Sequence, residues 1–143
     1  MIKIDEMIEF LQTMKLEKSS IDRKLILKEF NRFQYNRRYK AQLMTIACIV
    51  EEVTGINVGQ MMIKTSKTEI VTARQLSMYF MSEVTKLKPH IIGNFFATKR
   101  HHFDRNSVNH SIKKVQDYCD TDKWYRMKFE AIQKQVNETF LIT

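Results

Sequence analysis

The chain has 143 residues, enough to bury one core of ordinary size, and its formal net charge is +8. No run approaches the roughly 18 apolar residues that a membrane-spanning helix needs, and the acidic N-terminus is unlike a secretory signal. Three glycines and one proline leave few turn signals, which favours helices over many short strands. The charge is concentrated, because residues 64–115 hold ten Lys or Arg against three Asp or Glu. This distribution suits a polyanionic partner, although a soluble basic surface accounts for the charge alone about equally well.

Residues 1–39 are predicted to form a helical extension packed on the rest of the chain. Apolar residues at spacings of three and four favour an amphipathic helix over residues 2–15. Ser19 or Ser20 can cap a second helix, which carries Phe33 on its apolar stripe. We expect this extension to be the place where a second copy of the chain or another protein would bind.

The middle of the chain is predicted to hold two longer helices. The first covers residues 41–53 and should end at Gly55, because glycine accepts the left-handed backbone that closes many helices. Residues 56–67 are expected to form a loop with a short turn near Met61. The longest helix should follow, over residues 67–86, where apolar residues recur with the helical period.

The last part of the chain is predicted to hold three more helices. Pro89 suits the first turn of a short helix, where its missing N–H costs nothing. A connection over residues 97–103 should lead to Asp104, whose carboxylate can cap the next helix. Thr121 or Asp122 could open the final helix in the same way.

The cysteines and the single tryptophan are predicted to be structural. Cys48 and Cys119 lie far apart in apolar helical patterns, so two buried, reduced thiols are favoured over a disulfide. No paired cysteines suggest a metal site. Trp124 is more typical of a packing residue here than of a stacking platform.

The helix that begins at Asp104 has two different faces. Val108, Ser111, Ile112 and Val115 line the face that should be buried. Four polar side chains point largely to the other face, namely Arg105, Asn106, Asn109 and Lys113. Arg can bind guanine and Asn can bind adenine by paired hydrogen bonds in the major groove, so this face is typical of a recognition helix. Lys113 and Lys114 lie farther along and would more naturally meet phosphates.

Three groups of residues, in this order, resemble the C-terminal, origin-binding domain of the bacterial replication initiator DnaA. The resemblance covers about residues 40–118 and implies an all-α fold of about seven helices around a helix-turn-helix, similar to the Trp-repressor-like domains. Residues 119–143 would add a C-terminal helix to one globular unit. The groups are Glu69-Ile70-Val71-Thr72-Ala73-Arg74-Gln75-Leu76-Ser77-Met78-Tyr79, then Glu83-Val84-Thr85 with Ile92-Gly93 and Phe96, then Asp104-Arg105-Asn106-Ser107-Val108-Asn109-His110-Ser111-Ile112-Lys113-Lys114-Val115.

The resemblance implies which residues would read bases. The family's signature is Asp-His-Thr-Thr-Val-Leu-His-Ala, and Asp104 and His110 match its Asp and its later His. Arg105, Asn106 and Ser107 replace the His-Thr-Thr between them. Because these replacements change the hydrogen-bonding groups, the family's own DNA sequence cannot be assumed to be the target.

The resemblance also implies phosphate contacts around the start of the longest helix. Arg74 and Gln75 match a family Arg-Gln pair that grips phosphate. The preceding basic loop of the family inserts an arginine into the minor groove, but Ser66 stands at that position here. Lys64 and Lys67 are weaker substitutes, because lysine is a more strongly hydrated point charge.

The connection before the recognition helix is about four residues longer than in the family. The extra residues are basic, and Lys99 and Arg100 could reach the backbone of a duplex. One register places the insertion before Asp104. Another matches Arg100 and His102 to the signature and places the insertion after them, but it moves Val108 and His110 out of place.

These observations predict a duplex-DNA-binding protein with sequence preference that acts in replication initiation or its control, as a bacterial, phage or mobile-element product in the cytoplasm. A transcriptional regulator is an alternative, and an interaction or virion-associated module that keeps the fold without reading DNA is another. The chain lacks a Gly-rich phosphate loop, so neither ATPase activity nor a cofactor is expected. A metal-dependent nuclease is the weakest reading, since its ligand candidates lack a visible strand pair: His101, His102, Asp104, Asn106 and His110.

Overall fold

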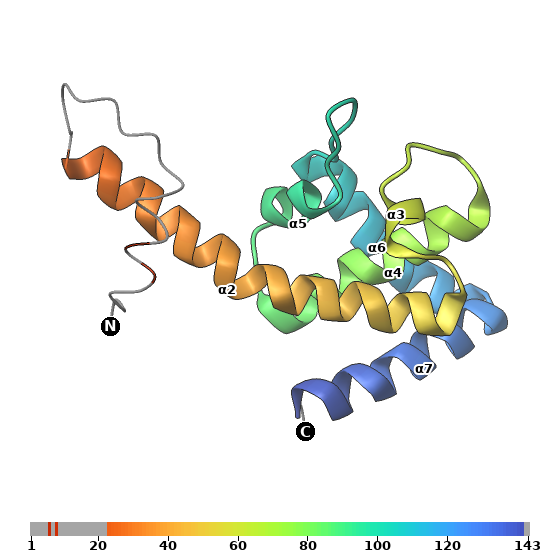
Figure 1. Ribbon diagram of the computed structural model, residues 1–143. Coiled ribbons are helices and arrows are strands. Elements are labelled where there is room, and N and C mark those ends of the chain that lie inside the picture. Colours follow the sequence, from red (N-terminus) through yellow and green to blue (C-terminus); the bar gives the residue numbers. More distant parts are fainter. Residues whose placement is uncertain (1–5, 7, 9–22, 142–143) are drawn as a thin grey trace. The chain divides into compact units, whose positions relative to one another are not determined.

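The computed structural model describes Glu6, Ile8 and residues 23–141, and within them the secondary structure is helical apart from a single isolated bridge between Thr98 and His101. The prediction of an all-α fold is confirmed. Apart from Glu6 and Ile8, which are helical, the predicted first helix and its neighbouring cap serines lie outside the described residues. The helices, shown in Figure 1, are α2 (Arg23–Thr54), α3 (Val58–Met61), α4 (Thr68–Thr85), α5 (Pro89–Phe95), α6 (Arg105–Thr121) and α7 (Lys123–Phe140).

The chain divides by its internal contacts into two compact units, Met1–Ala41 and Gln42–Thr143, and the division falls within α2. The prediction of two separate helices over this part of the chain was wrong. Residues 34–40 contain neither glycine nor proline, and residues such as Arg, Gln and Lys propagate a helix at little cost. The helix therefore continues from the first unit into the second.

The core of the second unit draws on every helix that it contains. Helix α4 packs against α3, α5, α6 and α7, and Figure 1 shows it running among them. The side chains at the centre are less than a tenth exposed: Ile46 and Val50 of α2, Met61 of α3, Leu76 and Phe80 of α4, Ile92 of α5, Val108 and Val115 of α6, and Ile132 and Val136 of α7.

The predicted helix ends are confirmed where a local signal marks them. Gly55 adopts a φ of 77° and its N–H donates to the Glu51 carbonyl at 2.8 Å, which closes α2. Pro89 occupies the first turn of α5. Asp104 caps α6, and Asp122 caps α7 by accepting hydrogen bonds from Trp124 and Tyr125.

Some predicted burials were wrong. Both cysteines are free, but Cys48 is exposed and Cys119 is half-buried. Cys48 lies on α2 between the core positions Ala47 and Ile49, and its side chain points outward on the same side as the exposed Met44. Trp124 is 73% exposed, because the buried stripe of α7 begins one residue later, at Tyr125.

Candidate nucleic-acid interface

Helix α6 is fixed at its first turn by a side-chain cap. The Oδ1 atom of Asp104 accepts a hydrogen bond of 2.7 Å from the Ser107 N–H. This hydrogen bond is the main reason why the pKa of the exposed Asp104 carboxyl lies below its usual value. Val108 and Val115, on the inner face of α6, are fully buried, while Ser111 and Ile112 are half-buried. The cap and the two valines hold α6 in one orientation on the unit.

The outer face of α6 carries the residues that the recognition pattern predicts. Most of them are exposed, and Lys114 is half-buried with its Nζ atom 5.9 Å from the centre of the Tyr118 ring. Arg, Asn and Ser side chains on one exposed helix face can meet both base edges and phosphates. The exposed residues are Arg105, Asn106, Ser107, Asn109, His110 and Lys113.

Arg74 lies inside the unit rather than on its surface. It is only 8% exposed, and its Nη1 atom donates to the carbonyl oxygens of Ile63 at 2.9 Å and Met61 at 3.2 Å. Its Cζ atom lies 4.5 Å from the centre of the Phe103 ring. Burial lowers the pKa of the guanidinium from its usual value. Arg74 therefore joins the loop after α3 to the residue that precedes the cap of α6.

Gln75 is internal as well. It is 8% exposed, and its Oε1 atom accepts a hydrogen bond of 3.4 Å from the Tyr125 hydroxyl. The side chain lines a hollow of about 270 Å³ that also touches Ser66 and Tyr118. The phosphate contacts predicted for Arg74 and Gln75 stay predictions, since the contacts seen for both side chains are within the protein.

Phe103 anchors the segment that leads into α6. Its ring meets the Phe96 and His101 rings at centroid distances of 6.4 and 4.2 Å, in both cases nearly edge to face. A Cβ atom on Gly93 would overlap the backbone carbonyl oxygen of Phe103 and would also approach Val108. Gly93 thus permits a close approach between α5 and this segment.

The extra residues before α6 form a tight turn. The Thr98 N–H donates to the His101 carbonyl at 2.7 Å, and the His101 N–H donates back at 3.3 Å. Lys99 and Arg100 occupy the turn and are exposed. This turn precedes Asp104, and α6 runs from Arg105 without interruption, while the register of the insertion relative to the family stays a prediction. We call residues 97–102 the basic hairpin.

His101 is the residue of the basic hairpin whose ring contacts the Phe103 ring. The residue is half-buried, and its Nε2 atom is buried without a hydrogen-bond partner. Burial lowers the pKa of the His101 imidazole, and the positive charges of Lys64, Arg74 and His102 lower it further. The loop before α4 therefore lies within electrostatic range of the basic hairpin.

The predicted basic loop precedes α4 directly. Lys64, Ser66 and Lys67 are exposed, and the Lys67 N–H donates to the Thr65 hydroxyl at 3.2 Å. Lys67 is also the residue before the first turn of α4, and no side chain caps that helix. We call residues 63–67 the basic loop.

Sequence reasoning missed two residues that position this surface, Gly93 and Phe103. Gly93 lies inside a short helix, where glycine destabilises the helix relative to alanine. Its presence there was the available sign that another segment approaches the backbone closely. The position of Phe103 beside Arg74 depends on residues 29 positions apart, and no local pattern reports it.

Helices α5 and α6 pack against each other across this connection and together define a helix-turn-helix protein. Residues 43–115 match the model of the family described as bacterial dnaA protein helix-turn-helix. Because the match covers just over half of the chain, the chain belongs to that family. The resemblance seen in the sequence is confirmed.

Several relatives are chromosomal replication initiator proteins DnaA. The chain is 36% identical over 70 residues to that of Bacteroides fragilis, which covers 49% of this chain and 14% of the relative. It is 31% identical over 88 residues to that of Spiroplasma citri, a match that covers 62% of this chain and 19% of the relative. It is 24% identical over 130 residues to that of Flavobacterium psychrophilum, a match that covers 91% of this chain and 26% of the relative. The chain thus spans about a quarter or less of these relatives. No solved structure matches the chain.

Two other kinds of feature are absent from the part of the chain that the structure describes. No group of three or more His, Cys, Asp or Glu there is arranged to hold a metal ion. None of the helices within the same residues combines the length and the apolar character that crossing a bilayer requires.

Proposed function

We propose that this protein binds duplex DNA with sequence preference, without catalysis, and that it acts in replication initiation or its control in a bacterial or phage-infected cell. The observation that carries the proposal is the exposed first turn of α6. Arg105 and Asn106 stand there on a helix held in place by the Asp104 cap and the buried Val108. Membership of the DnaA helix-turn-helix family supports the same function.

The polar and the cationic residues of this surface are suited to different parts of a duplex. Arg105, Asn106 and Asn109 carry donors and acceptors suited to base edges in the major groove. Lys113, farther along α6, is suited to a phosphate, as are the lysines of the basic loop. Contacts of the second kind supply affinity for any duplex, and contacts of the first kind supply preference for one sequence.

Selection of duplexes from a random pool, followed by affinity measurements over a range of salt, tests the proposal. We expect enrichment of a defined sequence, with an affinity that falls steeply as salt rises because bound phosphates release counterions. No nucleotide should be needed. If the purified protein binds no duplex, or binds equally at low and physiological salt, the proposal fails. Steep salt dependence without enrichment would instead favour a module that has lost sequence reading.

A further inference from the structure

The buried side chain of Arg74 contacts Ile63 in the basic loop (63–67) and Phe103, the residue that directly follows the basic hairpin (97–102). We propose that the two segments form a composite clamp for the phosphodiester backbone beside the first turn of α6, and that Arg74 is its internal brace rather than a phosphate ligand. This inference rests on the proposed duplex-binding function.

The contacts of Arg74 support the role of a brace. The Nη1 atom of its guanidinium donates hydrogen bonds to the carbonyl oxygens of Met61 and Ile63, at the start of the basic loop. The group also lies over the ring of Phe103, at the exit from the basic hairpin. A planar guanidinium can donate within its plane and stack with its face at the same time, whereas an ammonium group cannot. Arg74 therefore fixes the two segments relative to each other.

Contacts within the basic hairpin and at its C-terminal end hold it in place. The paired hydrogen bonds between Thr98 and His101 fix the turn, and the packing of Phe103 on Phe96 fixes its base. Gly93 lets the backbone carbonyl of Phe103 approach α5 more closely than any other residue would allow. Lys99 and Arg100 are thus presented on a supported turn, so less conformational entropy is lost when they bind a ligand.

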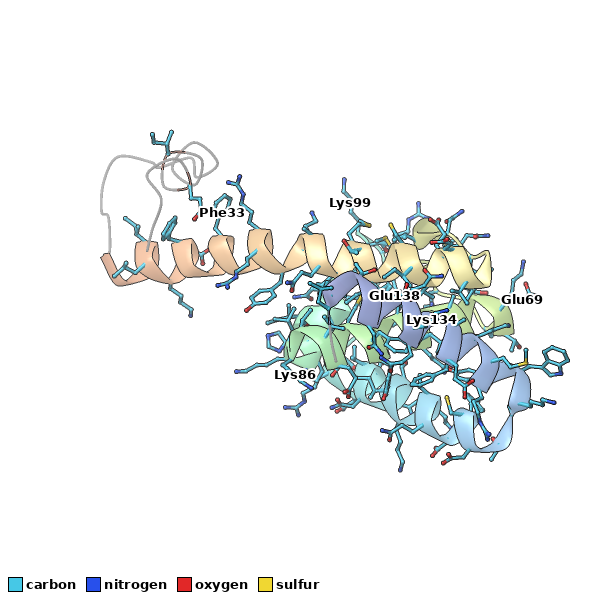
Figure 2. The ribbon with its side chains drawn as sticks, turned by 90° about the horizontal axis from the view of Figure 1, so that it is seen from below. Phe33, Glu69, Lys86, Lys99, Lys134 and Glu138 are labelled. Carbon is cyan, nitrogen blue, oxygen red and sulfur yellow. The ribbon has the colours of Figure 1, made fainter. Side chains whose placement is uncertain are left out.

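The charges of the two segments point to an anion. Neither segment contains an acidic residue, and the cations Lys64, Lys67, Lys99 and Arg100 are exposed. Figure 1 shows the loop before α4 and the turn before α6 projecting from the unit on the side opposite to α7. In Figure 2 the Lys99 side chain points away from the ribbon, well apart from Lys134 and Glu138 of α7. The ligand that fits is the repeating phosphate of a nucleic-acid backbone, because the exposed cations occur as two pairs on two separate segments.

The first experiment removes the two charges at the tip of the clamp. In the full chain, Lys99→Ala with Arg100→Ala should lower the magnitude of the slope of log affinity against log salt by about 2, close to 0.9 per phosphate lost. The ratio of affinities for the selected and a scrambled duplex should stay the same. The matched control is Lys128→Ala with Lys134→Ala, which removes two exposed cations from α7 and should leave the slope unchanged.

The second experiment separates a brace from a phosphate ligand. Arg74→Lys keeps the charge but cannot serve both loop carbonyls and the Phe103 ring, so we expect it to lower the slope as much as the Lys99 and Arg100 variant does. Combining the two changes should lower the slope by less than the sum of the two separate losses, because both remove the phosphate contacts of Lys99 and Arg100. Circular dichroism and thermal unfolding report whether the Arg74 variant is folded.

The outcomes are distinct. If the unaltered protein binds no duplex, the proposed function and the clamp both fall. If it binds with a steep salt dependence that the Lys99 and Arg100 variant leaves unchanged, the clamp alone is overturned, whatever happens to the Arg74 variant. If Arg74→Lys binds like the unaltered protein while Arg74→Ala lowers the slope by about 1 and adds to the hairpin variant, Arg74 is a phosphate ligand and the brace is overturned.

Discussion

Two arginine–amide pairs stand in opposite environments in this protein. Arg74 and Gln75 on α4 are each 8% exposed, and their polar atoms bind the protein itself. Arg105 and Asn106 on α6 are exposed beside the helix cap. The residue types are nearly the same, so burial decides what each pair can do. We therefore expect the first pair to act within the protein, and we propose the second pair for DNA recognition.

The largest expected difference between the two pairs is in the stability of variants that truncate each arginine. Arg74→Ala leaves two carbonyls without their donor and removes the contact with Phe103, and we expect a loss of about 3 kcal/mol. Arg105→Ala removes an exposed side chain and should change stability by less than about 0.5 kcal/mol. Urea unfolding of both variants measures the difference. Equal losses would mean that burial does not separate the two pairs.

A smaller loss of stability is expected at Gly93. An added Cβ would meet the backbone of Phe103, which cannot move without displacing the start of α6. We expect Gly93→Ala to cost about 2 kcal/mol by overpacking, more than the roughly 1 kcal/mol that alanine gains in a helix. Thermal unfolding checks the sign. As a control, Gly59→Ala in α3 meets only the end of the Asn57 side chain. An increase in stability for Gly93→Ala would contradict the close approach.

A still smaller loss of stability than at Gly93 is expected at the cap of α6, and it should depend on pH. The pKa of the Asp104 carboxyl is lowered by its hydrogen bonds, so ionised Asp104 stabilises the fold above its unfolded pKa, near 3.8. That contribution is lost as the pH falls through the lower, folded value. Asp104→Asn, which keeps the shape and the capping oxygen, should therefore unfold slightly more easily than the unaltered protein at neutral pH. The stabilities of the two proteins should converge once the pH is below that folded value, and a difference that grows on acidification would contradict this account.

Features with a local cause were predictable from the sequence. Gly55, Pro89, Asp104 and Asp122 each mark a helix end because their own backbone or side chain supplies what the end needs. The buried and exposed faces of α6 follow from its period in the same way, since Val108 and Val115 are buried.

Features that depend on distant residues were not predictable. Arg74 binds Ile63, 11 positions away, and lies against Phe103, so its burial is a property of the packed unit. Trp124 was expected to pack because tryptophan usually does, but the buried stripe of α7 starts at Tyr125. The helix break expected before residue 41 was wrong for a different, local reason: residues 34–40 contain neither glycine nor proline, so nothing in that segment ends α2.

We propose that the first turn of α6 reads sequence, and the affinities of Arg105→Ala and Asn106→Ala for two duplexes at one salt concentration test this. On the selected duplex each change should cost roughly 1–3 kcal/mol of binding free energy, because a base contact is lost. On a scrambled duplex of equal length the cost should be much smaller, and both variants should fold as stably as the unaltered protein. Equal losses on the two duplexes would show that this helix holds DNA without reading it, and the claim would be wrong.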